Sequence, residues 1–190
     1  TGAVWGSETY RFIPDAIIAS KAITAGYFPM GAVILGPDLA DRLQDAAEAE
    51  DEFPHGFTGS GHPVGCAIAR RAIDLIVDEG LMDNAQALAP RFFDGMDDLA
   101  ARHSNIGEVR GKGLMGALEA VADPDTKKPF ASDLSVSERI ANSCTDQGLI
   151  CRPLGQAIVL CPPFIMSGAQ MDEMFDKLDR ALTKVFAEVA

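Results

Sequence analysis

Short apolar runs alternate with longer amphipathic segments along this chain. Residues 16–19, Ala-Ile-Ile-Ala, predict a buried strand, and residues 31–35, Gly-Ala-Val-Ile-Leu, predict a second one. The segment 21–30 between them contains a glycine and a proline, so we predict a turn or loop there. A proline in the first turn of residues 37–50 favours an exposed helix over that range.

Helical periodicity dominates the middle and the end of the chain. After a Gly-, Pro- and His-containing loop at 53–62, apolar residues recur on one face over residues 63–79, and Gly80 would end that helix. A second helix is predicted over residues 81–102. The last helix, over residues 168–190, has an apolar stripe that we expect to face inward. That stripe consists of Met171, Met174, Phe175, Leu178, Leu182, Val185 and Phe186.

Shorter elements separate these helices. The alternation of apolar residues over 113–121 predicts a strand, and a polar, proline-containing loop follows. A helix is predicted over residues 135–147 because a serine at its start and a glutamate three residues later form a capping-box signature. Residues 150–152 and 157–161 predict two short strands around a turn at 153–155.

The order of these elements indicates the fold class. Short strands that alternate with helices indicate an α/β or α+β chain. The 190 residues suit one domain or a part of a larger protein, and a boundary near residue 80 would divide them. The chain lacks an initiator Met, so we expect that the start of the protein is missing.

Composition and charge exclude several classes of function. The formal net charge of −12 argues against a nucleic-acid surface, which requires clustered Lys and Arg. No apolar run reaches the roughly 18 residues needed to span a membrane. The N-terminus has no basic region followed by an apolar stretch, so we predict no signal peptide.

The chain has four cysteines, which indicate the redox state of its cellular compartment: Cys66, Cys144, Cys151 and Cys161. No pair has C-x-x-C spacing, and each cysteine lies in an apolar stretch. A reduced, buried cysteine behaves as a small apolar residue. We therefore expect structural, reduced cysteines in a cytoplasmic protein.

Lys21 is the first candidate for chemistry. It directly follows a predicted strand, and ligands of open α/β sheets bind outside the carboxyl ends of strands. A partly desolvated lysine there has a lowered pKa and can act as a nucleophilic amine. The alternative is an ordinary solvated lysine at a strand end, and position alone favours that alternative.

The loop at residues 55–63, His-Gly-Phe-Thr-Gly-Ser-Gly-His-Pro, is the second candidate. Exposed backbone N–H groups and hydroxyls near a helix start suit a phosphate. An ordinary capped connection explains the same residues equally well. His55 and His62 are seven residues apart with no third ligand nearby, so we predict no metal site.

A glycine motif and a single arginine are the remaining candidates, and we reject the first and keep the second. Gly111-x-Gly113-x-x-Gly116 has the letters of the dinucleotide fingerprint, but it leads into a strand instead of opening a helix, so we reject it. Arg152 lies in an apolar stretch and needs an anionic partner if it is buried. A protein carboxylate and a substrate carboxylate both suit its guanidinium, and composition does not choose between them.

Taken together and in order, three segments resemble the class III (ω-) aminotransferases of pyridoxal 5′-phosphate (PLP) fold type I. The resemblance is close to the bacterial amine–pyruvate transaminases and runs from Thr1 to Ala190. The first segment is residues 5–8 and 14–32, which are similar to the PLP-lysine signature of the family. The others are the loop at 55–63 and the region at 152–164.

The resemblance implies a fold and a domain organisation. It implies an α/β chain that holds the end of a PLP fold type I large domain plus an α+β C-terminal small domain. Residues 1–62 would end the large domain, residues 63–80 would form an interdomain helix, and residues 81–190 would form the small domain.

The resemblance also implies a role for each candidate residue. Lys21 would hold PLP through a Schiff base and then shuttle a proton as general base and acid. Thr58, with the Phe57 backbone, would bind the PLP phosphate of the neighbouring subunit, so a homodimer would share its active sites. Arg152 would grip a substrate carboxylate and swing aside for an apolar amine. Gly59 stands where relatives often have a larger residue.

The implied reaction is ping-pong transfer of an amino group from an amine or amino acid to pyruvate. In relatives, an Asp that pairs with the pyridine nitrogen of PLP lies upstream of the segment that matches Thr1, so we expect that these residues cannot catalyse alone. One alternative is a non-catalytic folded module in binding or assembly. Another is a different PLP reaction, an aminomutase or a decarboxylase, although Arg152 favours transamination.

Overall fold

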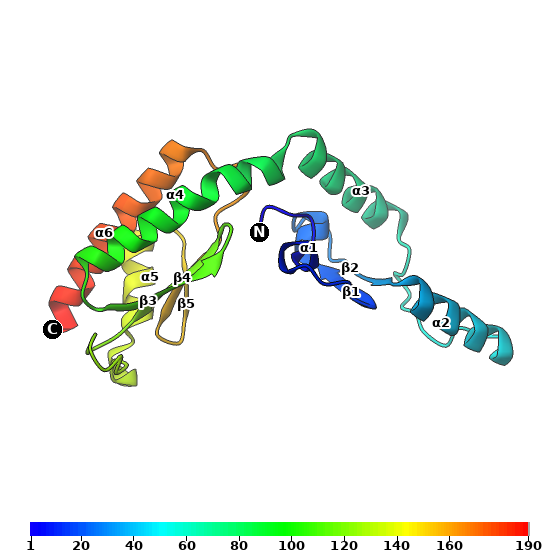
Figure 1. The fold of residues 1–190 in the computed structure, drawn as a ribbon, viewed down its shortest axis with the longest axis horizontal. Helices are drawn as coiled ribbons and strands as arrows, with labels where there is room; N and C mark the ends of the chain where they lie inside the picture. Colours follow the sequence, from blue (N-terminus) through cyan, green and yellow to red (C-terminus); the bar gives the residue numbers. More distant parts are fainter. Residues whose placement is uncertain (190) are drawn as a thin grey trace. The chain divides into compact units, whose positions relative to one another are not determined.

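The computed structural model describes residues 1–189 and divides the chain into two compact units. The N-terminal unit spans Ala3–Leu81, and the C-terminal unit contains Thr1–Gly2 and the chain from Met82 onward. Each unit is described by itself below, with the element labels of Figure 1. Ala190, the last residue of the predicted final helix, lies outside the described residues.

The N-terminal unit consists of a small sheet, a short 3-10 turn and three α-helices. The strands β1 and β2 pair antiparallel, with Ile18 opposite Val33. The helix α1 had no counterpart among the predicted elements, whereas β2 and α2 have their predicted bounds. In chain order, the elements are α1 Gly6–Tyr10, β1 Ala16–Ser20, the 3-10 turn η1 Lys21–Thr24, β2 Gly31–Leu35, α2 Pro37–Glu50 and α3 Pro63–Asp78.

The prediction that the two strands are buried is wrong for both, since Val33 of β2 is 62% exposed. Residues of β1 alternate between exposed and half-buried, and Ile18 is 83% exposed. Within the part of the chain that the structure describes, β1 pairs with β2 alone, and a two-stranded sheet cannot cover its own faces.

The C-terminal unit packs helices against a four-stranded antiparallel sheet with strand order β3-β4-β6-β5. The strand predicted at 113–121 is confirmed as β4, whereas β3, which forms a hairpin with it, was not predicted. The segment predicted as a turn at 153–155 supplies two residues of β5 instead. The elements are α4 Leu81–Arg102, β3 Ile106–Lys112, β4 Met115–Ala120, η2 Ser132–Leu134, α5 Val136–Asp146, β5 Arg152–Leu154, β6 Ala157–Leu160 and α6 Gly168–Val189.

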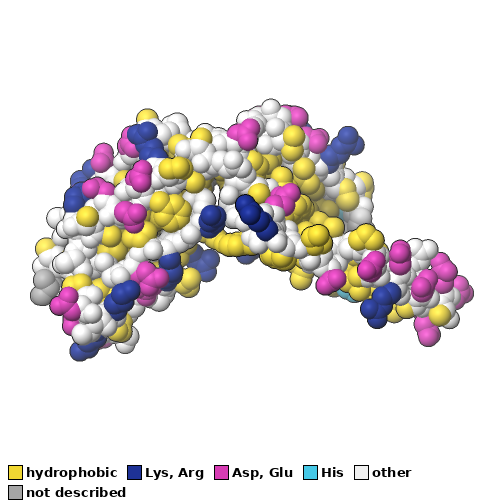
Figure 2. Space-filling view, viewed as in Figure 1, with side chains coloured by type: hydrophobic (Ala, Val, Ile, Leu, Met, Phe, Trp, Pro, Cys, Tyr) yellow, Lys and Arg dark blue, Asp and Glu magenta, His cyan; other side chains and the backbone are white. Residues whose placement is uncertain are grey.

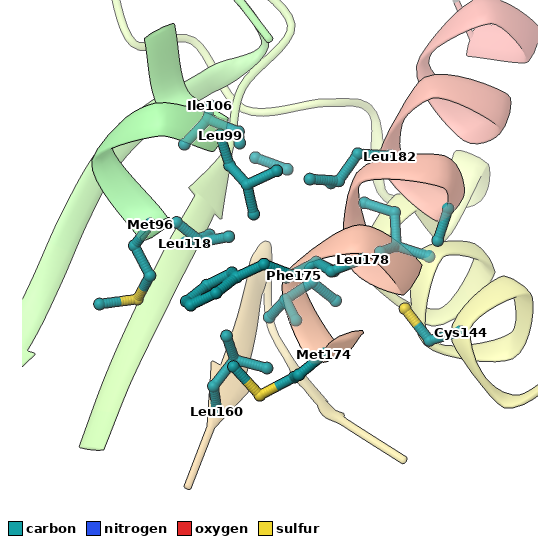
Figure 3. Close-up of a cluster of buried hydrophobic side chains, with 14 of the residues drawn as sticks. Met96, Leu99, Ile106, Leu118, Cys144, Leu160, Met174, Phe175, Leu178 and Leu182 are labelled. Carbon is teal, nitrogen blue, oxygen red and sulfur yellow. The ribbon is translucent and has the colours of Figure 1, made fainter. Parts of the chain in front are cut away.

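The core of this unit lies between the sheet and its helices. Figure 3 shows Met96 and Leu99 of α4, Leu118 of β4, and Phe175 and Leu178 of α6 converging on one cluster. The prediction that the apolar stripe of the last helix faces inward is confirmed, because all seven of its residues are buried. Burial of such side chains stabilises the fold by about 1.5–3 kcal/mol each.

Two local predictions for this chain are wrong. Ser135 makes no side-chain cap, because its backbone is left-handed (φ 44°, ψ 45°) and not extended as a capping serine requires. Cys66 and Cys161 are exposed, whereas Cys144 is buried and Cys151 half-buried. Cys66 lies on the exposed side of α3, which covers little within its own unit, and Cys161 follows the end of β6.

Candidate functional site

Lys21 lies at the carboxyl end of β1, as its position in the sequence predicted. Its backbone has a φ of 55°, in the left-handed region that costs a non-glycine residue about 1–2 kcal/mol. The turn that follows ends at Ala25, also left-handed, and the N–H of Gly26 donates to the Lys21 carbonyl at 3.4 Å. The side chain is exposed and forms no ion pair with any described residue, so its amine is free to meet a ligand.

A pocket of about 480 Å³ opens beside Lys21. That volume is in the range of about 300–1,000 Å³ typical of small-molecule sites. Its polar lining comes from Ser20, Lys21 and Thr24, and its apolar wall comes from the segment 28–30. The lysine therefore borders a space of the size of a small-molecule site.

A second pocket of about 280 Å³ shares part of this lining. Phe28, Pro29 and Met30 line both pockets, and the glycine-rich loop contributes further lining residues to the second one. Loop residues that line this pocket are Phe57, Gly59, Ser60, Gly61 and His62. The candidate lysine and the candidate phosphate loop thus belong to one unit but line two separate pockets.

Two short hydrogen bonds close the glycine-rich loop on itself. The N–H of Phe57 donates to Ser60 Oγ at 2.9 Å, and the N–H of Ser60 donates to the Phe57 carbonyl at 2.8 Å. Thr58 sits at the tip of this turn and is exposed, and no described residue forms a hydrogen bond with it. The turn therefore presents an unused hydroxyl and an unused N–H to an incoming anion, as a phosphate requires.

Arg152 is the first residue of β5, at the edge of the C-terminal sheet, and pairs with Val159 of β6. Its side chain is exposed, so the condition of burial under which it would need a protein carboxylate is not met. No described residue forms an ion pair with it. The guanidinium is free for a carboxylate ligand. Arg152 belongs to the C-terminal unit, whereas Lys21 and Thr58 belong to the N-terminal unit.

The rejected dinucleotide motif has a structural explanation. Its glycines occupy the β3–β4 hairpin, where Gly111 pairs with Gly116 and Gly113 adopts a φ of 62° in the turn. No helix opens there, so this motif does not form the phosphate site of a dinucleotide fold.

Thr24 and the wall at 28–30 are site residues that the sequence patterns did not single out. Thr24 is only 1% exposed, and its Oγ1 donates to the Phe28 carbonyl at 2.6 Å. A threonine three residues after a strand-end lysine, in a segment with glycine and proline, is a signal for such a side-chain-to-backbone bond.

The surface agrees with the acidic composition. Acidic side chains cover α2, as the space-filling view shows (Figure 2).

Among residues 1–189, no group of three His, Cys, Asp or Glu side chains could hold a metal ion. None of the described helices is both long enough and apolar enough to cross a membrane.

Comparisons with a family model and with solved structures give the same family for this chain. A family model described as aminotransferase class-III matches residues 1–182. The chain is 66% identical to a PLP-bound aminotransferase mutant from Vibrio fluvialis, with a TM-score of 0.98, over all of this chain and 42% of that one. It is 68% identical to an omega-aminotransferase from Paracoccus denitrificans, with a TM-score of 0.97 and the same coverage.

A curated relative gives the same result at lower identity. An uncharacterised aminotransferase from Sinorhizobium fredii is 37% identical over 191 residues, which is all of this chain and 41% of that protein. The chain therefore spans about two-fifths of the length of the relatives it matches.

Proposed function

This chain belongs to the class III aminotransferases, and on that premise we propose that it is the part of a PLP-dependent transaminase that holds the cofactor lysine. The observation that carries the proposal is the position of Lys21, whose free amine lines a pocket at the carboxyl end of β1. The full protein would transfer an amino group from an amine or amino acid to a keto acid.

The residues in this chain fit the cofactor. PLP carries an aldehyde and a phosphate, and the N-terminal unit offers an unpaired lysine amine and a glycine-rich turn with unused donors. The relative from Vibrio fluvialis, at 66% identity, is PLP-bound. When bound, PLP supplies an electron sink for the bond that breaks at the substrate Cα.

Lys21 would perform the proton transfer. Its Nζ would hold the cofactor covalently until an amine arrives, then take the proton from the substrate Cα and deliver it to C4′ of the cofactor. The left-handed backbone at Lys21 fixes the start of this side chain, so the amine begins from a defined direction.

Thr58 and the Phe57 backbone would bind the cofactor phosphate. Lys21 and the loop line different pockets of one unit, and we propose that the loop serves the cofactor held by the lysine of another subunit. That separation supports a homodimer in which each active site takes residues from both chains.

Arg152 would recognise the carboxylate of pyruvate or of an amino acid. Its guanidinium is exposed and unpaired among the described residues, so it could turn toward a carboxylate or away from an apolar amine. The same side chain would then serve both halves of a ping-pong reaction in which pyruvate accepts the amino group.

The test is to trap the cofactor on the full-length protein. Borohydride reduction, digestion and mass spectrometry should locate the PLP adduct on Lys21, and Lys21→Ala should abolish both the adduct and transamination. Reduction that leaves Lys21 unmodified, or that labels another lysine with full activity in the Lys21→Ala variant, would refute the proposal.

Substrate recognition has a separate test. In full-length Arg152→Ala, kcat/KM for pyruvate should fall about 10²–10³-fold, as expected when a charge-assisted contact is lost. The kcat/KM for an apolar amine donor should change less than about threefold. Equal losses for both substrates would show that Arg152 does not recognise the carboxylate.

We also propose that the protein acts in the cytoplasm. All four cysteines of the chain are free, and Cys144 is buried without a disulfide, as expected in a reducing compartment. Fractionation of producing cells would test this, and recovery of the protein outside the cytoplasmic fraction would refute it.

A further inference from the structure

The turn that follows Lys21 is closed by a buried hydroxyl. Thr24 is 1% exposed, and its Oγ1 donates to the Phe28 carbonyl at 2.6 Å. The same oxygen lies 3.4 Å from the Lys21 carbonyl. Because a hydroxyl has one proton, the shorter contact is the hydrogen bond and the longer one is secondary. Thr24 thus touches the backbone at both ends of the segment 21–28.

The backbone held in this way is strained. Lys21 and Ala25 are non-glycine residues in the left-handed region, with φ of 55° and 49°. Such residues persist only where the surroundings over-determine them. Three main-chain bonds close the turn, from Ala25 to the Ala22 carbonyl at 3.1 Å, from Gly26 to the Lys21 carbonyl at 3.4 Å and from Tyr27 to the Thr24 carbonyl at 3.0 Å. Among the described residues, the Phe28 carbonyl is bonded by the Thr24 hydroxyl and by no main-chain N–H.

Phe28 connects this turn to the helix that follows the glycine-rich loop. A Cβ on Gly65 of α3 would lie 2.7 Å from the Phe28 ring, so the ring packs directly on the α3 backbone. The Phe28 and His62 rings lie 5.3 Å apart between centroids. Phe28 is therefore fixed by Thr24 at its carbonyl and by α3 at its ring, and it lines the pockets of both candidate sites.

We propose that Thr24 is a positioning residue for Lys21: its buried hydrogen bond to Phe28 sets the direction of the lysine amine toward the cofactor. The inference rests on the proposed role of Lys21 as the cofactor lysine. Without the hydroxyl, the Phe28 carbonyl loses its partner and the left-handed conformation at Lys21 relaxes, while the pocket keeps its size because Val has nearly the shape of Thr.

The test uses the full-length holoenzyme and the variant Thr24→Val. We expect kcat to fall at least about tenfold with KM changed less than about threefold, because a mispositioned amine slows proton transfer without removing substrate contacts. Thr24→Ser, which keeps the hydroxyl, should recover most of the loss. Thr145→Val is the matched control, because it removes a threonine hydroxyl bonded to the Ala141 carbonyl at 2.9 Å in the other unit.

A second readout does not depend on activity. In the cofactor-free protein, the rate at which an amine-reactive reagent labels Lys21 at a fixed pH should change at least about twofold in Thr24→Val, because the amine then points in a different direction. Gly65→Ala should change that rate as well, because the added methyl pushes the Phe28 ring from the other side. If Thr24→Val does not fold, Gly65→Ala replaces it as the test variant.

Two failures can be told apart. If borohydride traps no cofactor on Lys21 of the wild type, the proposed function is wrong. If the wild type is trapped on Lys21 but Thr24→Val and Gly65→Ala keep wild-type kcat and the wild-type labelling rate, the positioning role of Thr24 is wrong. An equal loss in Thr24→Ser and Thr24→Val would also overturn it, because the hydroxyl would then not be the group that acts.

Discussion

Gly116 is the point at which the sheet of the C-terminal unit meets α4. It lies in β4, between β3 and β6, and pairs with Gly111 on one side and Leu160 on the other. A Cβ built on Gly116 would lie 2.6 Å from Met96 Cε, 2.7 Å from Met96 Sδ and 2.8 Å from Phe92 Cε1. We therefore expect Gly116→Ala to destabilise this unit.

The size of the effect follows from those distances. Carbon atoms pack at about 3.5–4.0 Å, so the methyl group requires a displacement of about 1 Å. Met96 and Phe92 are both fully buried, so neither side chain can move into solvent. Overpacking of this kind costs about 1–3 kcal/mol, and replacing a strand glycine offsets about 0.5–1 kcal/mol of it. Because both neighbours are fully buried, the overpacking cost should lie in the upper half of its range, about 2–3 kcal/mol, and the net loss in the free energy of unfolding should be about 1–2.5 kcal/mol.

Calorimetry of the full-length, cofactor-free protein measures this loss. The transition of the C-terminal unit should fall by about 4–10 °C in Gly116→Ala. Gly56→Ala is the matched control, because nothing lies within 4 Å of its Cβ position, and it should change stability by less than about 0.5 kcal/mol.

A double-mutant cycle identifies the contact itself. Met96→Ala removes the atoms that the new methyl meets, so Gly116→Ala should cost at least about 1 kcal/mol less in that background. If Gly116→Ala leaves the transition unchanged, or if the two effects simply add, the close approach of α4 to β4 is refuted.

Two other contacts of this unit give predictions for stability. Burial opposes ionisation of Asp179, but hydrogen bonds from His103 and Arg102 hold the pKa of its carboxyl below the ordinary value. Asp179→Asn should therefore lose about 1–2 kcal/mol at pH 7. This deficit, measured by urea unfolding, should shrink below about pH 4 as the wild-type carboxylate is protonated, and a constant deficit would contradict the assignment. Ser137→Ala should cost about 1 kcal/mol in the same assay, because the Gly155 carbonyl loses its 2.7 Å bond, and no loss would contradict that bond.

The sequence by itself determined the elements whose signal is local. The stripe from Met171 to Phe186 repeats at helical spacing, and all seven of its residues are buried in α6. Residues 31–35 and 37–50 form β2 and α2 with the predicted bounds. The position of Lys21 after a strand was also predictable, because an apolar run followed by a glycine- and proline-containing segment marks a strand end.

Tertiary structure decided which groups meet, because residue type alone does not record that. The glycine-containing strand β3 has little local strand propensity and forms because β4 supplies its hydrogen bonds. Ser135 has the residue type of a cap, but its backbone is in the left-handed region, where it cannot cap. Thr24 is buried because the chain folds back to bring the Phe28 carbonyl to its hydroxyl, with the Phe28 ring packed on α3. A pattern along the chain records periodicity and residue type, whereas burial and hydrogen bonding depend on which groups the fold brings together.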